Sequence, residues 1–328
     1  MILITGANGF LGQHLLRAVA GKGVPVRALY NRREPDAALR NLPGVEWMQA
    51  DLLDIYSAEA AMAGITHIYH CAAIVSFDAA RRDELIRANS DSTCNLVNAA
   101  LDADAAKLLH VSSVAAIGRD ERIKAPVTEA GEWVESKLNS AYAISKYGAE
   151  MEVWRGMAEG LDAVIINPGI ILGEGDWNEG SAHLMQVADG EFPYYTSGIN
   201  SFVDVADVVK AALALMHSDI SEERFIVSAG NFAYKEIFTL MAEALGKKPP
   251  HIAAGPALSA AVWRWQALLK TVTGKEPSVT RETARTAQAQ CFYDNSKLLK
   301  ALPGFTYTPM PETITRMATA YKQILAGG

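Results

Sequence analysis

Two tyrosine and lysine pairs with the same spacing are the residues whose types most directly suggest acid-base chemistry. Tyr142 and Lys146 form one pair, and Tyr293 and Lys297 form the other. On a helix, residues four positions apart share a face, so a lysine ammonium can lie beside a tyrosine phenol. A nearby cation lowers the pKa of a tyrosine from about 10, which makes the phenol usable as an acid-base group at neutral pH. Because the spacing occurs twice, its context must decide between the pairs.

The surrounding sequence favours Tyr142 and Lys146. They open a long helical pattern over 141–158, which follows a short apolar strand and two hydroxyl side chains, Ser112 and Ser113. In a parallel sheet, catalytic groups gather beyond the carboxyl ends of the strands. We therefore expect the first pair, with one of the two serines, to form a catalytic site.

A glycine-rich turn stands at the start of the chain. The run Thr5-Gly-Ala-Asn-Gly-Phe-Leu-Gly12 lies between an apolar strand and an amphipathic helical pattern. Its glycines permit a tight turn, close approach of the backbone to a pyrophosphate, and close packing of the helix on the strand. The dipole and unpaired N–H groups of the helix then favour a negative charge. The residues expected to contact a dinucleotide here are Gly6, Asn8, Gly9, Phe10, Leu11 and Gly12.

The end of the second expected strand favours NADP over NAD. Folds that bind NAD normally carry an acidic residue there, which binds the ribose 2′-hydroxyl. Here the run reads Leu29-Tyr-Asn-Arg-Arg33, with two arginines and no acid. Because a guanidinium group suits a phosphate, we expect Asn31 and Arg32 to hold the 2′-phosphate of NADP. A solvated loop, with NAD as the cofactor, is the alternative.

The composition argues against several classes of protein. The chain has 328 residues, of which 50% are hydrophobic and 20% charged, and its formal net charge is -7. This balance gives no electrostatic reason to expect nucleic acid or an anionic membrane as a partner. No apolar run is long enough to span a bilayer. The three cysteines and seven histidines lack paired spacing, which predicts a cytoplasmic protein without a bound metal.

Alternating short apolar runs and longer helical patterns predict an α/β fold. The expected strands are 2–5, 26–30, 46–49, 67–71, 107–111 and 163–167, and the clearest helices are 11–19, 83–101, 141–158 and 206–216. Such repeats imply a Rossmann-type, doubly wound parallel sheet with helices on both faces. We expect a dinucleotide-binding domain over 1–167 and roughly 201–217. A smaller, interleaved C-terminal substrate domain would take 168–200 and 218–328.

These residues together resemble the extended branch of the short-chain dehydrogenase/reductase family, which includes sugar-nucleotide epimerases, dihydroflavonol reductases and 3β-hydroxysteroid dehydrogenases. The resemblance covers nearly the whole chain. Its matching motifs are the Thr5 to Gly12 turn, Asp51-Leu52, His70-Cys-Ala-Ala73, Ser113, Tyr142 with Lys146, Asn167-Pro-Gly169 and Phe202-Val-Asp-Val-Ala-Asp207. The run from Tyr293 to Lys297 looks like a structural element of this family, so we do not expect it to be catalytic.

The resemblance implies a role for each matching residue. Tyr142 would be the general acid-base, Ser113 would hydrogen-bond the substrate oxygen, and Lys146 would hold the nicotinamide ribose while lowering the pKa of Tyr142. The further cofactor contacts that it implies are Asp51 and Leu52 at the adenine, Ala72 and Ala73 along the cofactor, and Pro168 and Gly169 at the carboxamide. The hydride would pass between cofactor and substrate carbon while Tyr142 passes the proton.

The substrate pocket is less well defined by the sequence. Four residues in turns at the carboxyl edge of the sheet are candidates to line it: Ser76, Phe77, Trp177 and Asn178. The stretch 256–273 carries Trp263 and Trp265. Burial in the smaller domain is its simplest account, and a homodimer face or a substrate lid are the alternatives.

The expected reaction is NADP-dependent hydride transfer to or from a small carbonyl or alcohol. Family members that use nucleotide sugars usually carry a diphosphate-binding arginine, and the corresponding stretches 167–173 and 200–202 contain none. A sugar or nucleotide-sugar epimerase is the alternative within the family. A redox sensor that binds dinucleotide without turnover is the alternative outside the enzymes, and the intact set of Ser113, Tyr142 and Lys146 argues against it.

Overall fold

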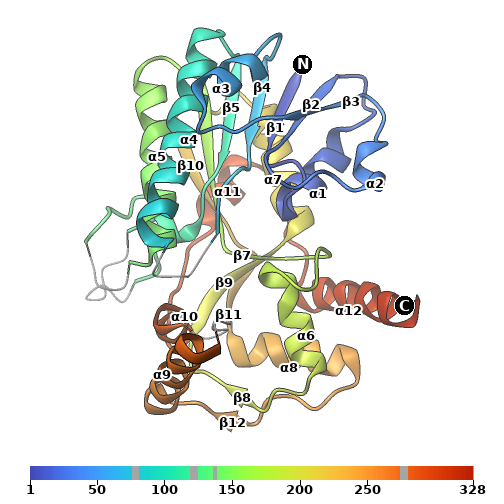
Figure 1. Ribbon diagram of the computed structural model, residues 1–328, viewed down its shortest axis with the longest axis vertical. Coiled ribbons are helices and arrows are strands. Elements are labelled where there is room, and N and C mark those ends of the chain that lie inside the picture. Colours follow the sequence, from blue (N-terminus) through green and yellow to red (C-terminus); the bar gives the residue numbers. More distant parts are fainter. Residues whose placement is uncertain (76–80, 119–124, 136–138, 274–279, 328) are drawn as a thin grey trace.

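Seven parallel strands form a central sheet in the part of the chain that the structure describes (Figure 1). The computed structural model describes residues 1–75, 81–118, 125–135, 139–273 and 280–327. The strands of this sheet are β1 (Ile2–Thr5), β2 (Val26–Tyr30), β3 (Val45–Gln49), β4 (His67–His70), β5 (Lys107–Val111), β6 (Ala163–Pro168) and β10 (Glu223–Val227). Their order across the sheet is β10-β6-β5-β4-β1-β2-β3, and every neighbouring pair is parallel.

The strand order reverses between β1 and β4. From β1 the chain adds β2 and β3 on one side, and it then crosses over to add β4, β5 and β6 on the other. A sheet of this kind binds ligands in the crevice beyond the carboxyl ends of its strands, where the order reverses. In this protein the crevice is therefore flanked by the turn after β1 and by the residues after β4.

Helices cover both faces of the central sheet (Figure 1). The helices of this part are α1 (Phe10–Val19), α2 (Ala37–Arg40), α3 (Ile55–Ala61), α4 (Arg82–Asp102), α5 (Ala141–Ala158), α7 (Val205–Met216) and α11 (Ser296–Ala301). Successive strand residues point to opposite faces, so Leu3 packs among residues of α3, α4 and α5, and Ile4 packs among those of α1 and α7. Burial on both faces explains why these strands are almost continuously apolar.

A smaller part of the protein lies beyond the carboxyl edge of the sheet (Figure 1). Its strands are β7 (Ile170–Leu172), β9 (Ile199–Asp204) and β11 (Gly230–Ala233), with a separate pair, β8 (Tyr194–Tyr195) and β12 (Ile252–Ala253). Its helices are α6 (His183–Asp189), α8 (Tyr234–Leu245), α9 (Pro256–Thr273), α10 (Arg281–Thr286) and α12 (Met310–Gly327). Strand β9 joins the two parts, because Val203 packs in the core of the larger one and Phe202 in that of the smaller one.

The predicted Rossmann-type sheet is confirmed, and most expected elements differ from the observed ones by a residue or two at their ends. The predicted domain boundary is wrong in two places. Strand β10 pairs in parallel with β6, and α11 packs on β10, so both belong to the larger domain and not to the substrate domain. Phe225 and Leu298 are buried in the core beside α7. The short run that forms β10 gave no sign in the sequence of which sheet it joins.

None of the helices described by the structure combines the length and apolar character required to cross a membrane.

The place of β10 in the central sheet predicts a large stability effect at Phe225, whose side chain is only 2% exposed. We expect Phe225→Ala to lower the free energy of unfolding by about 3–5 kcal/mol, because the change removes buried apolar surface and leaves a cavity. Denaturant titration followed by circular dichroism measures this loss.

The matched control is Leu299→Ala in α11, where the side chain is 39% exposed. Its expected effect stays within about 0.5 kcal/mol. Equal losses for the two variants would contradict the assignment of β10 to the core of the sheet.

Candidate active site

The glycine-rich turn leaves no room for side chains at two of its positions. Gly6 has a φ of +62°, and a Cβ built on it would lie 2.8 Å from the Cα of Ala72. A Cβ on Gly12 would lie 2.1 Å from the carbonyl oxygen of Gly6. The turn is thus packed against both α1 and the end of β4. Helix α1 follows Gly9 and has no capping side chain, so its first N–H groups can serve an anion.

A chain of buried hydrogen bonds holds this turn to β4 and α4. The Thr5 hydroxyl accepts a hydrogen bond from the Ala72 N–H at 3.1 Å and lies 2.8 Å from His70 Nδ1. His70 Nε2 lies 3.0 Å from the hydroxyl of Thr93, which donates to the carbonyl oxygen of Asn89. Burial lowers the pKa of His70 to about 3, so the ring is neutral. The side chains that bind the glycine-rich turn to β4 and α4 are therefore uncharged.

Asn89 connects the cofactor crevice to the helix that carries Tyr142. Its side-chain oxygen accepts from the Ile74 N–H at 2.7 Å, and its amide nitrogen donates to the Ile74 carbonyl oxygen and to Ser145 Oγ. The Ser145 hydroxyl donates in turn to the carbonyl oxygen of Tyr142. Sequence reasoning missed this residue. The available signal was an asparagine at a position of α4 that the helical pattern assigns to the buried face.

The residues expected at the adenosine end of a cofactor lie together beyond β2 and β3. Asn31 and Arg32 are exposed, and the Asn8 side chain donates to the carbonyl oxygen of Arg33 at 2.6 Å. Asp51 is exposed and accepts from the Leu53 N–H. These positions leave the polar groups of the loops open to a ligand.

The other predicted cofactor residues are divided between buried and open positions. Leu52 is 7% exposed and Ala73 is exposed at the end of β4. Pro168 ends β6, and a Cβ on Gly169 would lie 2.7 Å from the carbonyl oxygen of Ser201. The backbone at Gly169 thus approaches β9 more closely than any side chain would allow.

The three predicted catalytic residues come together at the carboxyl edge of the sheet. A hydrogen bond joins the side chains of Ser113 and Tyr142. Lys146 lies one helical turn after Tyr142, is 3% exposed, and donates to the Val111 carbonyl oxygen at 2.8 Å. The hydroxyl of Ser112 is instead bound to a buried glutamate at 2.6 Å, away from the tyrosine. Ser113 is thus the serine that lies beside Tyr142.

The groups that shift the pKa of Tyr142 are its buried surroundings and Ser113, and the expected effect of Lys146 on it stays a prediction. Burial raises the pKa of Tyr142, and the hydrogen bond with Ser113 lowers it by less. Burial also lowers the pKa of Lys146 to about 8, against the opposing effect of the Glu150 carboxylate. The ammonium is directed to the Val111 carbonyl oxygen, so Tyr142 is a protonated phenol at neutral pH.

The predicted substrate residues have mixed outcomes. Ser76 and Phe77 lie outside the described residues. Trp177 is 7% exposed and packs edge-on against Tyr321 in the core of the smaller domain, so its predicted place in the substrate pocket is wrong. Asn178 is exposed and bonded to its neighbour Asp176. An apolar residue in a turn was mistaken for a pocket wall because its core partner is far away in sequence.

The second tyrosine and lysine pair has packing and ion-pair partners, and its structural role stays a prediction. Tyr293 is 4% exposed and packs beside Val114 and Ile226. The Lys297 ammonium contacts the Glu223 carboxylate and the Arg224 carbonyl oxygen. Lys297 thus lies on α11 and contacts two residues of β10.

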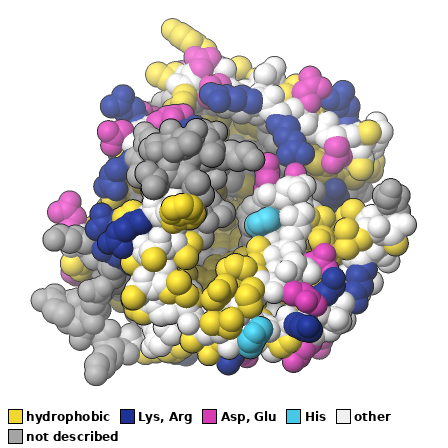
Figure 2. Space-filling view, turned by 60° about the horizontal axis from the view of Figure 1, so that its bottom comes forward, with side chains coloured by type: hydrophobic (Ala, Val, Ile, Leu, Met, Phe, Trp, Pro, Cys, Tyr) yellow, Lys and Arg dark blue, Asp and Glu magenta, His cyan; other side chains and the backbone are white. Residues whose placement is uncertain are grey.

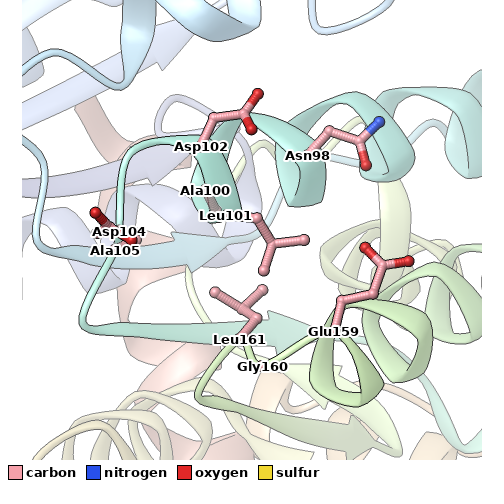
Figure 3. Close-up of a pocket in the computed structure, with 9 residues that line it drawn as sticks. All are labelled: Asn98, Ala100, Leu101, Asp102, Asp104, Ala105, Glu159, Gly160 and Leu161. Atoms are coloured by element: carbon pink, nitrogen blue, oxygen red, sulfur yellow. The ribbon is translucent and has the colours of Figure 1, made fainter.

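The surface of the protein carries a hollow (Figure 2) and a separate pocket. Figure 2 shows that the face bearing the smaller domain is hollowed near its centre, with hydrophobic side chains around the hollow. A different pocket, of about 710 Å³, lies where α4 and α5 end (Figure 3). Asp102, Asp104 and Glu159 line it, at the opposite edge of the sheet from Ser113. Its acidic lining disfavours an anionic dinucleotide.

Comparison with known proteins agrees with this geometry. The model of the NAD dependent epimerase/dehydratase family matches residues 2–228. The chain is 32% identical over 260 residues to "Sterol demethylase protein B" of Methylococcus capsulatus, with 78% of each chain covered. It is 28% identical over 244 residues to cinnamoyl-CoA reductase 1 of Petunia hybrida, covering 69% of this chain and 72% of the relative.

A solved structure of similar fold is the UDP-glucose 4-epimerase of Thermotoga maritima, with a TM-score of 0.79, 19% identity and 99% of both chains covered. At this identity the likeness concerns the fold alone. Together with the family match over most of the chain, it confirms the resemblance drawn from the motifs. The protein therefore belongs to the NAD dependent epimerase/dehydratase family, the extended short-chain dehydrogenases/reductases, and is an NAD(P)-dependent oxidoreductase.

Proposed function

We propose that this protein is an NADP-dependent reductase of a small, largely apolar carbonyl compound, with Tyr142 as its proton donor. The observation that carries the proposal is the juxtaposition of the pair Ser113 and Tyr142, with the buried Lys146 one helical turn after the tyrosine. The pair lies at the carboxyl edge of the sheet, where the glycine-rich turn opens a dinucleotide crevice.

The proposed mechanism assigns each step to a side chain of this site. A reduced nicotinamide held at this site would supply the hydride for the substrate carbon. Ser113 donates a hydrogen bond to the substrate carbonyl oxygen and orients it, and Tyr142 gives that oxygen its proton. Lys146 would hold the nicotinamide ribose through its ammonium and so help to orient a bound cofactor. The raised pKa of Tyr142 leaves the phenol protonated, which is the form that a proton donor needs.

The site's surroundings support an apolar substrate. Ile74 and Val75 follow the predicted cofactor residue Ala73 and are 39% and 62% exposed. The place where nucleotide-sugar enzymes usually carry an arginine is occupied by Asn200 and Ser201. Asn200 is bonded to the Tyr234 hydroxyl, and Ser201 is fully buried. Neither side chain offers a cation to a sugar diphosphate, which favours the reductase over the epimerase alternative.

The acid-base role of Tyr142 is tested by Tyr142→Phe. We expect turnover to fall by at least about a hundredfold while the NADPH dissociation constant stays near that of the wild type, because only the proton donor is removed. NADPH consumption with a panel of aldehydes, ketones and nucleotide sugars measures turnover. Tyr293→Phe, in the other pair, is the matched control and should retain full activity. Wild-type turnover in Tyr142→Phe would rule out the proposed role.

The preference for NADP is tested by Arg32→Ala. The loss of a charge-assisted contact with the 2′-phosphate is expected to weaken NADPH binding by about tenfold and leave NADH binding unchanged. Fluorescence titration gives both dissociation constants. Arg17→Ala, an exposed arginine on α1, is the control. If the ratio of the two constants does not move in Arg32→Ala, the arginine does not select the cofactor.

The buried ammonium of Lys146 predicts a pH dependence of cofactor binding. Its pKa is lowered by burial to about 8, so the donor to the ribose hydroxyls is present below that pH and is lost above it. We therefore expect the NADPH dissociation constant to rise as the pH increases through about 8. In Lys146→Met this rise should be absent. Identical pH profiles for the two proteins would show that the lysine does not contact the cofactor.

A further inference from the structure

Glu150 is a carboxylate with no exposed surface, two helical turns after Tyr142 on α5. Its Oε2 accepts hydrogen bonds from the Ser112 hydroxyl at 2.6 Å and the Asn167 amide at 2.8 Å. Its Oε1 accepts from Arg224 Nη1 at 2.8 Å. A carboxylate so deep in a protein is tolerated only when it is paired and hydrogen-bonded, as this one is.

Two of these partners lead to the same peptide, that of Ser113. Ser112 precedes Ser113 in the chain, so the bond from its hydroxyl to Glu150 fixes the backbone at the end of β5. The Asn167 amide also donates to the Ser113 carbonyl oxygen at 3.0 Å. The Glu150 carboxylate thus holds the Ser113 backbone by two routes. One runs through the hydroxyl of Ser112, and the other runs through the side-chain amide of Asn167 on β6.

Arg224 extends the network to the segment that flanks the serine. Its Nε and Nη2 donate to the carbonyl oxygens of Glu129 and Gly131, each at 2.8 Å. The same segment packs closely on the chain that follows Ser113, since a Cβ on Gly118 would lie 1.5 Å from the Glu132 carbonyl oxygen. The ion pair of Glu150 and Arg224 therefore fixes α5, β10 and this segment relative to one another.

The charge of Glu150 also acts on Lys146, one helical turn earlier. The groups that face this ammonium are the Val111 carbonyl oxygen and the Cys71 thiol, with the neutral rings of His70 and His110 nearby. Burial lowers the Lys146 pKa, and the Glu150 carboxylate makes the largest contribution in the opposite direction, ahead of Cys71. It is thus a counter-charge for the lysine as well as an anchor for the serine.

We propose that Glu150 is a positioning residue of the active site, whose buried carboxylate aligns Ser113 with Tyr142 and lies one helical turn from Lys146. The proposal rests on the proposed function of these three residues. Glu150 acts through Ser112, Asn167 and Lys146, and it touches neither substrate nor cofactor. A small displacement of Ser113 relative to the phenol is costly, because hydride and proton transfer depend on the alignment of the reacting atoms.

The test is Glu150→Gln, which keeps a hydrogen-bond acceptor of the same size and removes the charge. We expect kcat to fall by about ten- to a hundredfold with little change in KM, since alignment and not binding is disturbed. We also expect the pH at which NADPH binding weakens to move downward, because the Lys146 pKa falls further once its counter-charge is lost. The second readout needs only cofactor binding and no turnover.

Asn167→Ala separates the two parts of the proposal. It removes the amide that bridges Glu150 and Ser113 but keeps the carboxylate. The expected result is a similar loss of kcat with the pH dependence of NADPH binding unchanged. Asp207→Asn is the control, because Asp207 is another buried carboxylate that accepts two hydrogen bonds, both from Thr308. It should leave kcat and the pH dependence as they are in the wild type.

Wild-type kcat in folded Glu150→Gln would overturn the proposal. If that variant does not fold, as judged by its thermal unfolding, wild-type kcat in Asn167→Ala would overturn it equally. Failure of the proposed function has a different signature, in which Tyr142→Phe turns over as the wild type does. The shift in the pH dependence of NADPH binding then still decides whether Glu150 acts on Lys146.

Discussion

The site depends on the close approach of two backbones where the strand order reverses. The turn after β1 touches the residues after β4 at Gly6 and Ala72, with no space for a side chain between them. This contact sets the width of the crevice into which a dinucleotide must fit. The bond from the Ala72 N–H to Thr5 holds the same two segments from inside the sheet. Any residue larger than glycine at position 6 would force the two strands apart.

Apolar packing does not by itself specify polar partners at the ends of the helices, because burial of apolar surface is non-directional. Asn89 on α4 and Glu150 on α5 add directional bonds to the ends of β4, β5 and β6. Such bonds are strong because they lie in a low dielectric. These bonds fix the position of α5, which carries Tyr142, relative to the end of β5, which Ser113 follows.

The sequence was a reliable guide where structure is local and less so where it depends on distant partners. The first strands were predictable because burial on both faces makes each a continuous apolar run, and the turn from Gly6 to Gly12 has a direct steric reason for its residues. The placement of β10 was not predictable, since a short apolar run can join either sheet. Trp177 was misjudged because its partner, Tyr321, comes more than a hundred residues later.

The charges of the site also depend on burial and on partners that the sequence pattern does not reveal. Helical spacing correctly placed Lys146 one turn from Tyr142, but it could not reveal that burial would act on both groups. The Lys146 ammonium donates to the Val111 carbonyl oxygen, and the phenol keeps its proton. A protonated phenol bonded to a serine is arranged to donate to an oxygen that gains negative charge. This arrangement supports the proposed role of Tyr142 as the proton donor.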